Sequence, residues 1–205
     1  MKILFIDTSS FFVSIGIIDD NKILSLYQDE VRDDMSSKIM PIISESFDSV
    51  AFSIKDIDKI MVVNGPGSFT GVRIGVTIAK VLAWSLKKEL ISISSLEYLA
   101  TSKVDSKYVI PMIDARRGYV YGAVYDCELN TIVEDCYDTY DSFSSYFNEG
   151  TIISLDALEG SVKPSLDILK VINKHINDTP ANFYSLKPNY LKKTEAEEKL
   201  EKSND

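Results

Sequence analysis

Short apolar runs separated by polar turns organise the first part of the chain. Mostly apolar runs predict buried strands at residues 2–6, 11–18 and 22–27. The turn cluster Asp19-Asp20-Asn21 lies between the second and third runs, so these two strands should form a hairpin. A polar loop is expected at residues 28–34, and Ser36 or Ser37 can cap a helix that runs to residue 52.

The longest helical pattern follows a glycine-rich turn. Residues 60–63 predict a buried strand and residues 70–87 a long helix, joined by Asn64-Gly65-Pro66-Gly67-Ser68-Phe69. Glycine lets another backbone or a ligand come close, and a helix N-terminus capped by Ser68 or Thr70 would suit an anion. The spacing matches neither a Walker loop, nor a dinucleotide fingerprint, nor a nucleophile elbow. A structural turn and a phosphate cradle are therefore equal alternatives.

The second half of the chain continues with both kinds of element. Strands are predicted at residues 90–93, 107–113, 119–126, 131–137 and 151–154. Helices are predicted at residues 95–102, 141–147 and 165–173. A polar link at 103–106 indicates two lobes, residues 1–102 and a smaller second lobe at 103–192. Residues 193–205 contain hardly any apolar side chains and should form a solvated tail.

Several stretches together resemble one protein family. The glycine turn continues as Thr70-Gly71-Val72-Arg73-Ile74-Gly75. It is accompanied, in order along the chain, by Ile6-Asp7-Thr8-Ser9, Ile91-Ser92-Ile93-Ser94-Ser95-Leu96-Glu97, Ile113-Asp114-Ala115-Arg116-Arg117-Gly118-Tyr119-Val120-Tyr121 and Pro188-Asn189-Tyr190-Leu191. This combination resembles the bacterial TsaB (YeaZ) proteins, which are subunits of the machinery that makes threonylcarbamoyladenosine on tRNA. The resemblance is good over residues 1–125 and patchy in the last third.

The resemblance implies a fold, a function and a set of partners. The fold is α/β, of the actin-like ATPase (ribonuclease H-like) type, with two lobes of which the second is reduced. The function is that of a non-catalytic scaffold or activator that pairs with a TsaD-type catalytic subunit in the cytoplasm. A TsaE-type ATPase is the further partner, the chain alone forms a homodimer, and tRNA is bound only through the complex.

A nucleotide site is the second implication of the resemblance. In the actin-like superfamily the loop after the first strand touches nucleotide phosphates or their metal, and here that loop carries Asp7, Thr8 and Ser9. The facing turn would add Gly65, Gly67 and Ser68. Turn and capping roles for the same side chains are an equal alternative. No cofactor is expected to bind tightly, and ATP or ADP is expected at most at an interface shared with a partner.

Metal-dependent catalysis is not expected. The catalytic relatives carry an HxxxH motif, whose spacing lets two imidazoles reach one metal, on the helix that corresponds to residues 95–102. In this chain the matching positions are Ser95 and Leu99. The single histidine, His175, lies among polar residues and is predicted to be a surface residue. Neither a metal site nor a catalytic residue can be named.

Composition limits the function further. The formal net charge is -9, and the lysines are dispersed along the sequence, so the isolated chain should bind tRNA weakly. The start of the chain is a poor signal peptide, and no apolar run approaches the length of a membrane span. Cys127 and Cys136 are too few for a disulfide framework and should be reduced thiols.

A partner surface is predicted on the two long helices. The helix at 70–87 is apolar around most of its circumference, which implies burial on more than one side. In the family, this helix and the one before it form the contact with the TsaD-type partner. The expected contributors are Met35, Ile39, Ile43, Arg73, Ile74, Thr77, Ile78 and Val81. The alternative is that Ile74, Ile78 and Val81 pack against the chain's own sheet.

Other features have two interpretations. Asp114-Ala115-Arg116-Arg117 could place a charged pair in the cleft between the lobes or form a salt-bridged turn. Trp84 and the alternating tyrosines from Tyr119 to Tyr125 could stack on RNA bases, although cross-strand packing is the commoner role. The alternative function is a small ATP-using phosphotransferase, but the second lobe has no glycine-rich phosphate loop. A simple homodimer with structural duties is a third alternative.

Overall fold

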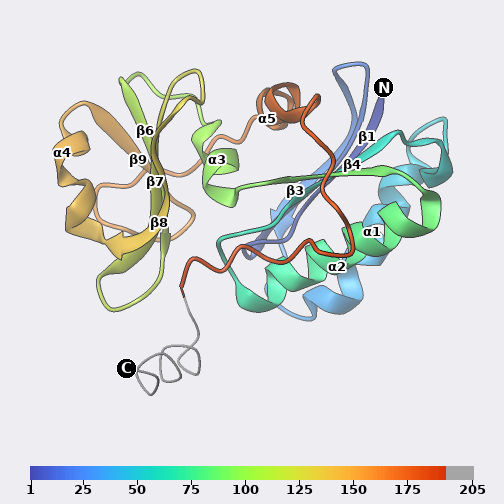
Figure 1. Ribbon diagram of the computed structural model, residues 1–205, viewed down its shortest axis with the longest axis horizontal. Coiled ribbons are helices and arrows are strands. Elements are labelled where there is room, and N and C mark those ends of the chain that lie inside the picture. The colour runs from blue at the N-terminus through green and yellow to red at the C-terminus, as the bar shows by residue number, and fades with distance from the viewer. Residues whose placement is uncertain (193–205) are drawn as a thin grey trace.

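The computed structural model describes residues 1–192, which form two β-sheets lying side by side (Figure 1). The first sheet has the strand order β3-β2-β1-β4-β5. Its strands are β1 (Lys2–Asp7), β2 (Phe12–Asp19), β3 (Lys22–Glu30), β4 (Lys59–Val63) and β5 (Glu89–Ile93). The β2–β3 hairpin is antiparallel, whereas β1, β4 and β5 are parallel. This arrangement is the one expected for an actin-like lobe.

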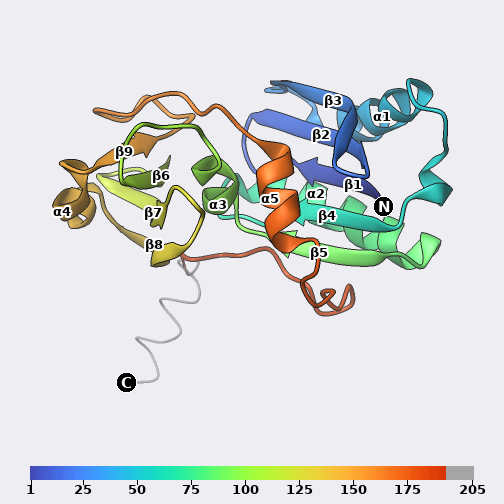
Figure 2. The ribbon, with the colours of Figure 1, turned by 90° about the horizontal axis from the view of Figure 1, so that it is seen from above.

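Helices cover both faces of the first sheet. Alternate residues of a strand point to opposite faces, so Leu4 and Ile6 of β1 pack under α1 (Met35–Asp48) and α2 (Phe69–Leu86). Ile3 and Phe5 face the other way, against α5 (Ile168–His175) and Tyr98 of α3 (Ser95–Ala100). Figure 2 shows α5 crossing the sheet on the face opposite α2. Two separate apolar cores result.

The second sheet has the order β8-β7-β6-β9. Its strands are β6 (Tyr108–Asp114), β7 (Tyr119–Asp126), β8 (Thr131–Thr139) and β9 (Gly150–Ile153). A short 3₁₀ turn (Tyr140–Phe143) and α4 (Ser144–Phe147) connect β8 to β9, and another 3₁₀ turn (Ile54–Asp56) precedes β4. Phe143 packs against Gly122 of β7, where a larger residue would not fit.

Some predicted boundaries were wrong. Residues 28–30 extend the edge strand β3 instead of starting a loop, because their backbone pairs with β2. Asp29 and Glu30 are exposed, whereas the Gln28 side chain donates to the Tyr98 hydroxyl at 3.1 Å. Helix α1 begins at Met35 after Asp34, so neither Ser36 nor Ser37 is its cap. Helix α5 begins later than predicted, at Ile168, and is capped by Asp167. The predicted tail at 193–205 lies outside the described residues.

The end of the described chain returns to the first sheet. The buried face of α5 packs on β1 and β4, and residues 177–192, which we call the strap, then run back along α2. Ala181 N–H donates to the Leu90 carbonyl at 2.7 Å, and Asn189 N–H donates to the Asn64 carbonyl at 2.7 Å. The division at residues 102 and 103 stays a prediction, but the apolar face of α5 and much of the strap pack with the first sheet, while Lys170, Lys174 and Lys192 also contact the second lobe.

Helix α2 is long and apolar enough to cross a membrane by length and composition alone. That differs from the expectation that no stretch has the length of a span. A core helix of a soluble protein passes the same test, and the residues that α2 buries against the sheet are mostly small: Gly71, Val72, Gly75, Val76, Ala79 and Ala83. This packing accounts for the buried side of the helix, while Phe69, Val81 and Trp84 are exposed.

Candidate functional site

A cavity of about 220 Å³ lies between the two sheets, at the carboxyl end of β1. The first lobe supplies its floor from the loop after β1 and from the glycine turn, and the second lobe supplies its roof from β6 and β7. The polar lining residues are Asp7, Ser9, Ser10, Ser68, Ser95, Tyr98, Asp114, Tyr121 and Asp156. The structure thus brings together the Asp7 loop, the glycine turn and Asp114, for which the sequence left a place in the cleft and a turn as alternatives.

The glycine turn is shaped by close contact with the loop after β1. A Cβ atom at Gly67 would lie less than 3.0 Å from the carbonyl oxygen of Ser9, and one at Gly71 would lie equally close to the carbonyl oxygen of Thr8. A Cβ atom at Gly75 would meet the hydroxyl of Thr8. Backbone atoms cannot yield as a flexible side chain can, so positions 67 and 71 require glycine. At Gly75 the contact is with a side chain that is itself buried and hydrogen-bonded.

Hydrogen bonds within the turn lead to the same interpretation. Ser68 N–H donates to the Ser9 carbonyl at 2.7 Å, and Gly71 N–H donates to the Ser68 hydroxyl, which caps α2. The buried Thr8 hydroxyl donates to the Gly71 carbonyl at 2.7 Å. Of the two alternatives for the glycine turn, the structural one accounts for these contacts.

Three carboxylates dominate the charge of the cavity. Asp7 is buried, and its carboxylate accepts the Ser9 N–H at 2.8 Å. Burial raises the pKa of Asp7 to about 6, although the Ser9 hydrogen bond acts in the opposite direction. Asp114 and Asp156 enter from the second lobe, where the Asp156 carboxylate accepts the Asp114 N–H at 2.8 Å. The residues that line the cavity include no lysine or arginine.

These residues do not fit a polyphosphate bound by this chain alone. Phosphate groups need cations or free N–H donors, whereas this cavity presents carboxylates and a turn whose N–H groups at Ser68 and Gly71 are already bonded. Gly67 and Ser68 lie beside the Asp7 loop, and Ser68 is hydrogen-bonded to it, whereas the Gly65 carbonyl accepts the Ser95 N–H at the start of α3. Their nucleotide role stays a prediction.

Replacing Asp7 by asparagine should stabilise the protein by about 2–3 kcal/mol at pH 7, because the pKa of Asp7 lies above its unfolded value of 3.8. The folded state holds the proton more tightly than the unfolded state between pH 3.8 and pH 6, so the penalty for burying the charge grows over that range. Urea denaturation at several pH values checks this. A D7N variant whose advantage does not grow as pH rises to 6 would contradict it.

Ser95 and Leu99 are the positions that match the predicted metal ligands of the catalytic relatives, and in this chain both take part in packing. The Ser95 hydroxyl donates to the Pro66 carbonyl, and Leu99 packs in the core between α3 and the second sheet. No group of three or more His, Cys, Asp or Glu side chains within residues 1–192 could hold a metal ion. Cys127 and Cys136 are both free thiols.

The prediction for His175 was wrong, since its ring is largely buried. Its Nε2 lies 2.7 Å from Glu97 of α3 and its Nδ1 lies 2.6 Å from Asp178. Lys174 bonds Glu97 at 2.5 Å and also donates to the Leu129 carbonyl in the β7–β8 turn, so the cluster links the two sheets. The sequence did not reveal this role because Glu97 lies 78 residues away.

The His175 cluster should make stability depend on pH. Burial opposes the charged ring, but the hydrogen bonds to Glu97 and Asp178 outweigh it and raise the pKa of His175. A raised folded pKa gives a stabilisation that is complete below the ordinary histidine pKa of 6.5 and is lost as pH rises through the folded pKa. We therefore expect His175→Gln to destabilise the protein more in acid than in mildly alkaline solution. If denaturation experiments show equal losses in the free energy of unfolding in acid and in mildly alkaline solution, this prediction is refuted.

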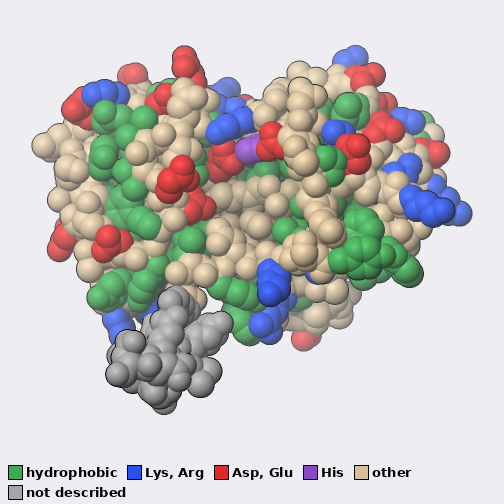
Figure 3. All heavy atoms as spheres, in the orientation of Figure 1, with side chains coloured by type: hydrophobic (Ala, Val, Ile, Leu, Met, Phe, Trp, Pro, Cys, Tyr) green, Lys and Arg blue, Asp and Glu red, His purple; other side chains and the backbone are tan. Residues whose placement is uncertain are grey.

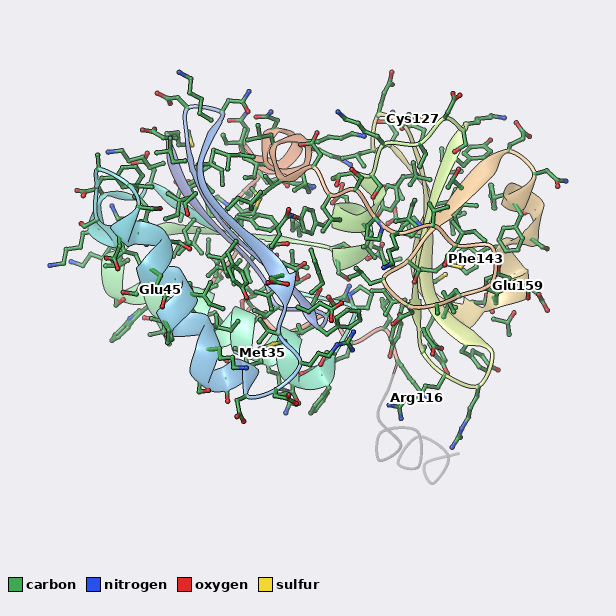
Figure 4. The ribbon with its side chains drawn as sticks, turned by 180° about the vertical axis from the view of Figure 1, so that it is seen from behind. Met35, Glu45, Arg116, Cys127, Phe143 and Glu159 are labelled. Carbon is green, nitrogen blue, oxygen red and sulfur yellow. The ribbon has the colours of Figure 1, made fainter. Side chains whose placement is uncertain are left out.

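The predicted partner surface is only partly exposed. Ile39 and Ile43 are buried in the first core, so these two were wrong as surface residues of this chain. Arg73, Thr77 and Val81 are exposed, while Ile74, Ile78 and Met35 are half-buried between the helices. Ile74, Thr77 and Ile78 line a groove beside α1 with Met40, which the sequence analysis missed. Figure 4 shows Met35 at the start of α1.

The alternating tyrosines and the charged turn of the second lobe have structural roles. Tyr119 and Tyr137 stack with ring centroids 4.9 Å apart, and Tyr121 also contacts Tyr137, so cross-strand packing is confirmed for these tyrosines. The Asp114 carboxylate accepts the Arg116 N–H at 2.7 Å and shapes the β6–β7 turn. Arg116 lies at the outer end of that turn (Figure 4), away from the predicted place in the cleft.

The family model described as TsaD, tRNA N6-adenosine threonylcarbamoyltransferase, matches residues 29–198 of this chain. The tRNA threonylcarbamoyladenosine biosynthesis protein TsaB of Bacillus subtilis is 40% identical over 126 residues, which are 61% of this chain and 55% of that protein. TsaB of Escherichia coli is 34% identical over 135 residues, covering 64% of this chain and 58% of that protein. The matches thus span less than two thirds of these curated relatives.

The solved structure of YeaZ from Pseudomonas aeruginosa shares the fold, with a TM-score of 0.79 over 93% of this chain and 99% of that one, at 20% identity. The actin-like fold class is therefore confirmed. The chain belongs to the family of the matching model, tRNA N6-adenosine threonylcarbamoyltransferase, and it is similar over part of its length to the TsaB proteins.

Proposed function

We propose that this chain is a non-catalytic subunit of the machinery that makes N6-threonylcarbamoyladenosine on tRNA. It pairs with a TsaD-type catalytic subunit through α1 and α2 and organises that subunit's chemistry in the cytoplasm. A TsaE-type ATPase joins the pair, and the chain forms a homodimer when alone. The full-length relatives' names supply the pathway, and the arrangement of subunits is our proposal.

The observation that carries the proposal is the chemistry of the cavity. It holds Asp7, Asp114 and Asp156 with no lining cation, and Ser95 is committed to the Pro66 carbonyl. An enzyme that transfers phosphoryl groups needs cations or metal ions to neutralise the charge that it moves. This cavity therefore supports a scaffold better than the alternative of an ATP-using phosphotransferase.

A nucleotide fits the proposal only at a shared interface. The partner would have to supply the positive charge that the lining of this chain's cavity lacks. The Asp7 loop and the glycine turn would then form one rigid side of the shared nucleotide site. Under this proposal ATP turnover by the purified chain should not exceed background, and turnover that disappears in a D7N variant would favour the phosphotransferase alternative.

Reconstitution of the modification tests the function directly. The catalytic subunit, the ATPase, tRNA and the substrates are combined with and without this chain, and threonylcarbamoyladenosine is measured in the digested tRNA. We expect modification to depend on the chain and to survive a D7N substitution. Equal rates with and without the chain would overturn the assignment to this machinery.

A further inference from the structure

Two segments that are far apart in the sequence lack acidic residues entirely. No aspartate or glutamate occurs between Lys59 and Lys88, or between Thr179 and Lys192, in a chain with 31 acidic and 22 basic residues. The first segment contains α2 and the second forms most of the strap. Because the strap lies along α2, the fold brings the two acid-free segments together.

Direct contacts fix the strap on one side of α2. Lys80 donates from Nζ to the Leu186 carbonyl at 2.8 Å. Arg73 donates from Nε to the Tyr190 hydroxyl at 2.6 Å, and its guanidinium lies 3.7 Å from the centre of the Phe69 ring. Arg73, Lys80 and the later residue Lys87 are spaced by seven positions, which is two turns of a helix, so they share one face.

An open aromatic groove lies at the far end of this face. Trp84 from α2 and Phe183 and Tyr184 from the strap line it, together with Lys87 and Lys88. Trp84 is 58% exposed and Tyr184 is 76% exposed, so both rings are open to solvent. Glu89 also lines the groove, and its carboxylate is paired with Lys59 at 2.9 Å. Figure 3 shows hydrophobic side chains beside Lys and Arg side chains on this face.

We propose that this surface, which we call the basic–aromatic strip, binds a single-stranded stretch of RNA. Its residues are Trp84, Lys87, Lys88, Phe183, Tyr184 and Lys187. The bases stack on the exposed rings of Trp84 and Tyr184, and the lysines neutralise neighbouring phosphates. The aromatic groove of the strip shares no lining residue with the partner groove, which lies nearer the start of α2.

Charge and ring exposure together favour RNA over an acidic protein. Protein interfaces are depleted in lysine at their centres, whereas here Lys87 and Lys88 flank the exposed rings. A platform of aromatic faces with cations beside it is the usual surface for single-stranded nucleic acid. The choice of RNA rests on the proposed function in tRNA modification. The strip contains few cations. It therefore adds contacts to RNA, while the rest of the complex supplies most of the affinity.

Trp84 is the one tryptophan of the chain and reports binding directly. The full chain is titrated with a single-stranded RNA of about 12 nucleotides, a length that covers one binding site of this type. We expect saturable quenching of tryptophan fluorescence, with a dissociation constant in the micromolar range that weakens as salt is raised. No quenching at low salt with RNA in large excess would overturn the proposal.

Variants localise the contact by the anisotropy of labelled RNA. Replacing Lys87 and Lys88 by alanine should weaken binding about ten-fold and reduce its salt dependence, and Tyr184→Ala should weaken it at least about five-fold. The matched controls, Lys22→Ala with Lys55→Ala and Tyr119→Ala, change exposed residues elsewhere and should bind normally. Equal losses in the controls would overturn the assignment to this strip.

Two further outcomes separate this inference from the proposed function. If RNA leaves Trp84 unchanged while the purified catalytic subunit quenches it, the strip is a protein contact and the inference is wrong. Reconstituted modification would still support the scaffold role in that case. Conversely, RNA binding by the strip with modification independent of the chain would sustain the inference and overturn the proposed function.

Discussion

Replacing Gly71 by alanine should destabilise the protein by about 3 kcal/mol, although alanine in a helix is usually about 1 kcal/mol better than glycine. The sign reverses because the new Cβ would lie less than 3.0 Å from the backbone carbonyl oxygen of Thr8. The loop after β1 would have to move away from α2, and Asp7 and Ser9 would move with it. Urea denaturation gives the loss, and the G71A variant should retain its overall fold.

Gly118 provides the matched control for that substitution. It lies in the β6–β7 turn and not in a helix, and a Cβ atom there would have no neighbour within 4 Å. Because Gly118 has a φ of +78°, we expect G118A to destabilise the protein by only roughly 1 kcal/mol, as is typical of that backbone conformation. Similar losses for G71A and G118A would show that the close approach of Thr8 to α2 is not what fixes glycine at position 71.

Replacing Thr77 by glutamate should weaken binding to the catalytic subunit by about 100-fold or more while leaving the chain folded. Thr77 is exposed on α2, so the free protein can solvate the new charge. In the proposed complex the carboxylate would be buried without a partner, which costs about 3–5 kcal/mol. Ile78→Glu should act in the same direction. Sedimentation and pull-down with the purified subunit measure both effects.

Thr131 supplies the control for the partner surface. It is an exposed threonine on β8 of the second lobe, remote in the sequence from both helices, so Thr131→Glu makes the same chemical change elsewhere. We expect this variant to bind the catalytic subunit normally and to form homodimers. Normal binding by T77E would show that the exposed face of α2 is not the contact.

Much of the first lobe was predictable from local patterns. The runs at β1, β2 and β4 are apolar because both faces of their sheet are covered, and β5 and α2 were found within a residue or two of their bounds. The end of β3 was not predictable, because its polar residues 28–30 are held by backbone pairing with β2. The helix α5 was predicted to begin at residue 165 but begins at Ile168. Its cap, Asp167, lies where no regular apolar period begins, so the sequence pattern did not mark this boundary.

The candidate site was predictable in its parts but not in its chemistry. The Asp7 loop and the glycine turn were identified from the family motif, and the structure places them together. The sequence left open whether the glycines serve a phosphate or the backbone. That question depends on the distance between the Thr8 carbonyl and α2, which no local pattern encodes. Likewise, Asp156 was not identified, because only the pairing of β6 with its neighbours brings it to the cavity.

The sequence by itself determined the family, the hairpin of β2 and β3 and the absence of a histidine pair at positions 95 and 99. Local patterns are sufficient there because motifs, strand runs and residue types are properties of contiguous stretches. Only the tertiary structure decided that His175 joins Glu97, and that lysines that look dispersed lie on one side of α2 beside Trp84 and Tyr184. Both depend on the chain's return to the first sheet through α5 and the strap, which brings together residues about a hundred positions apart.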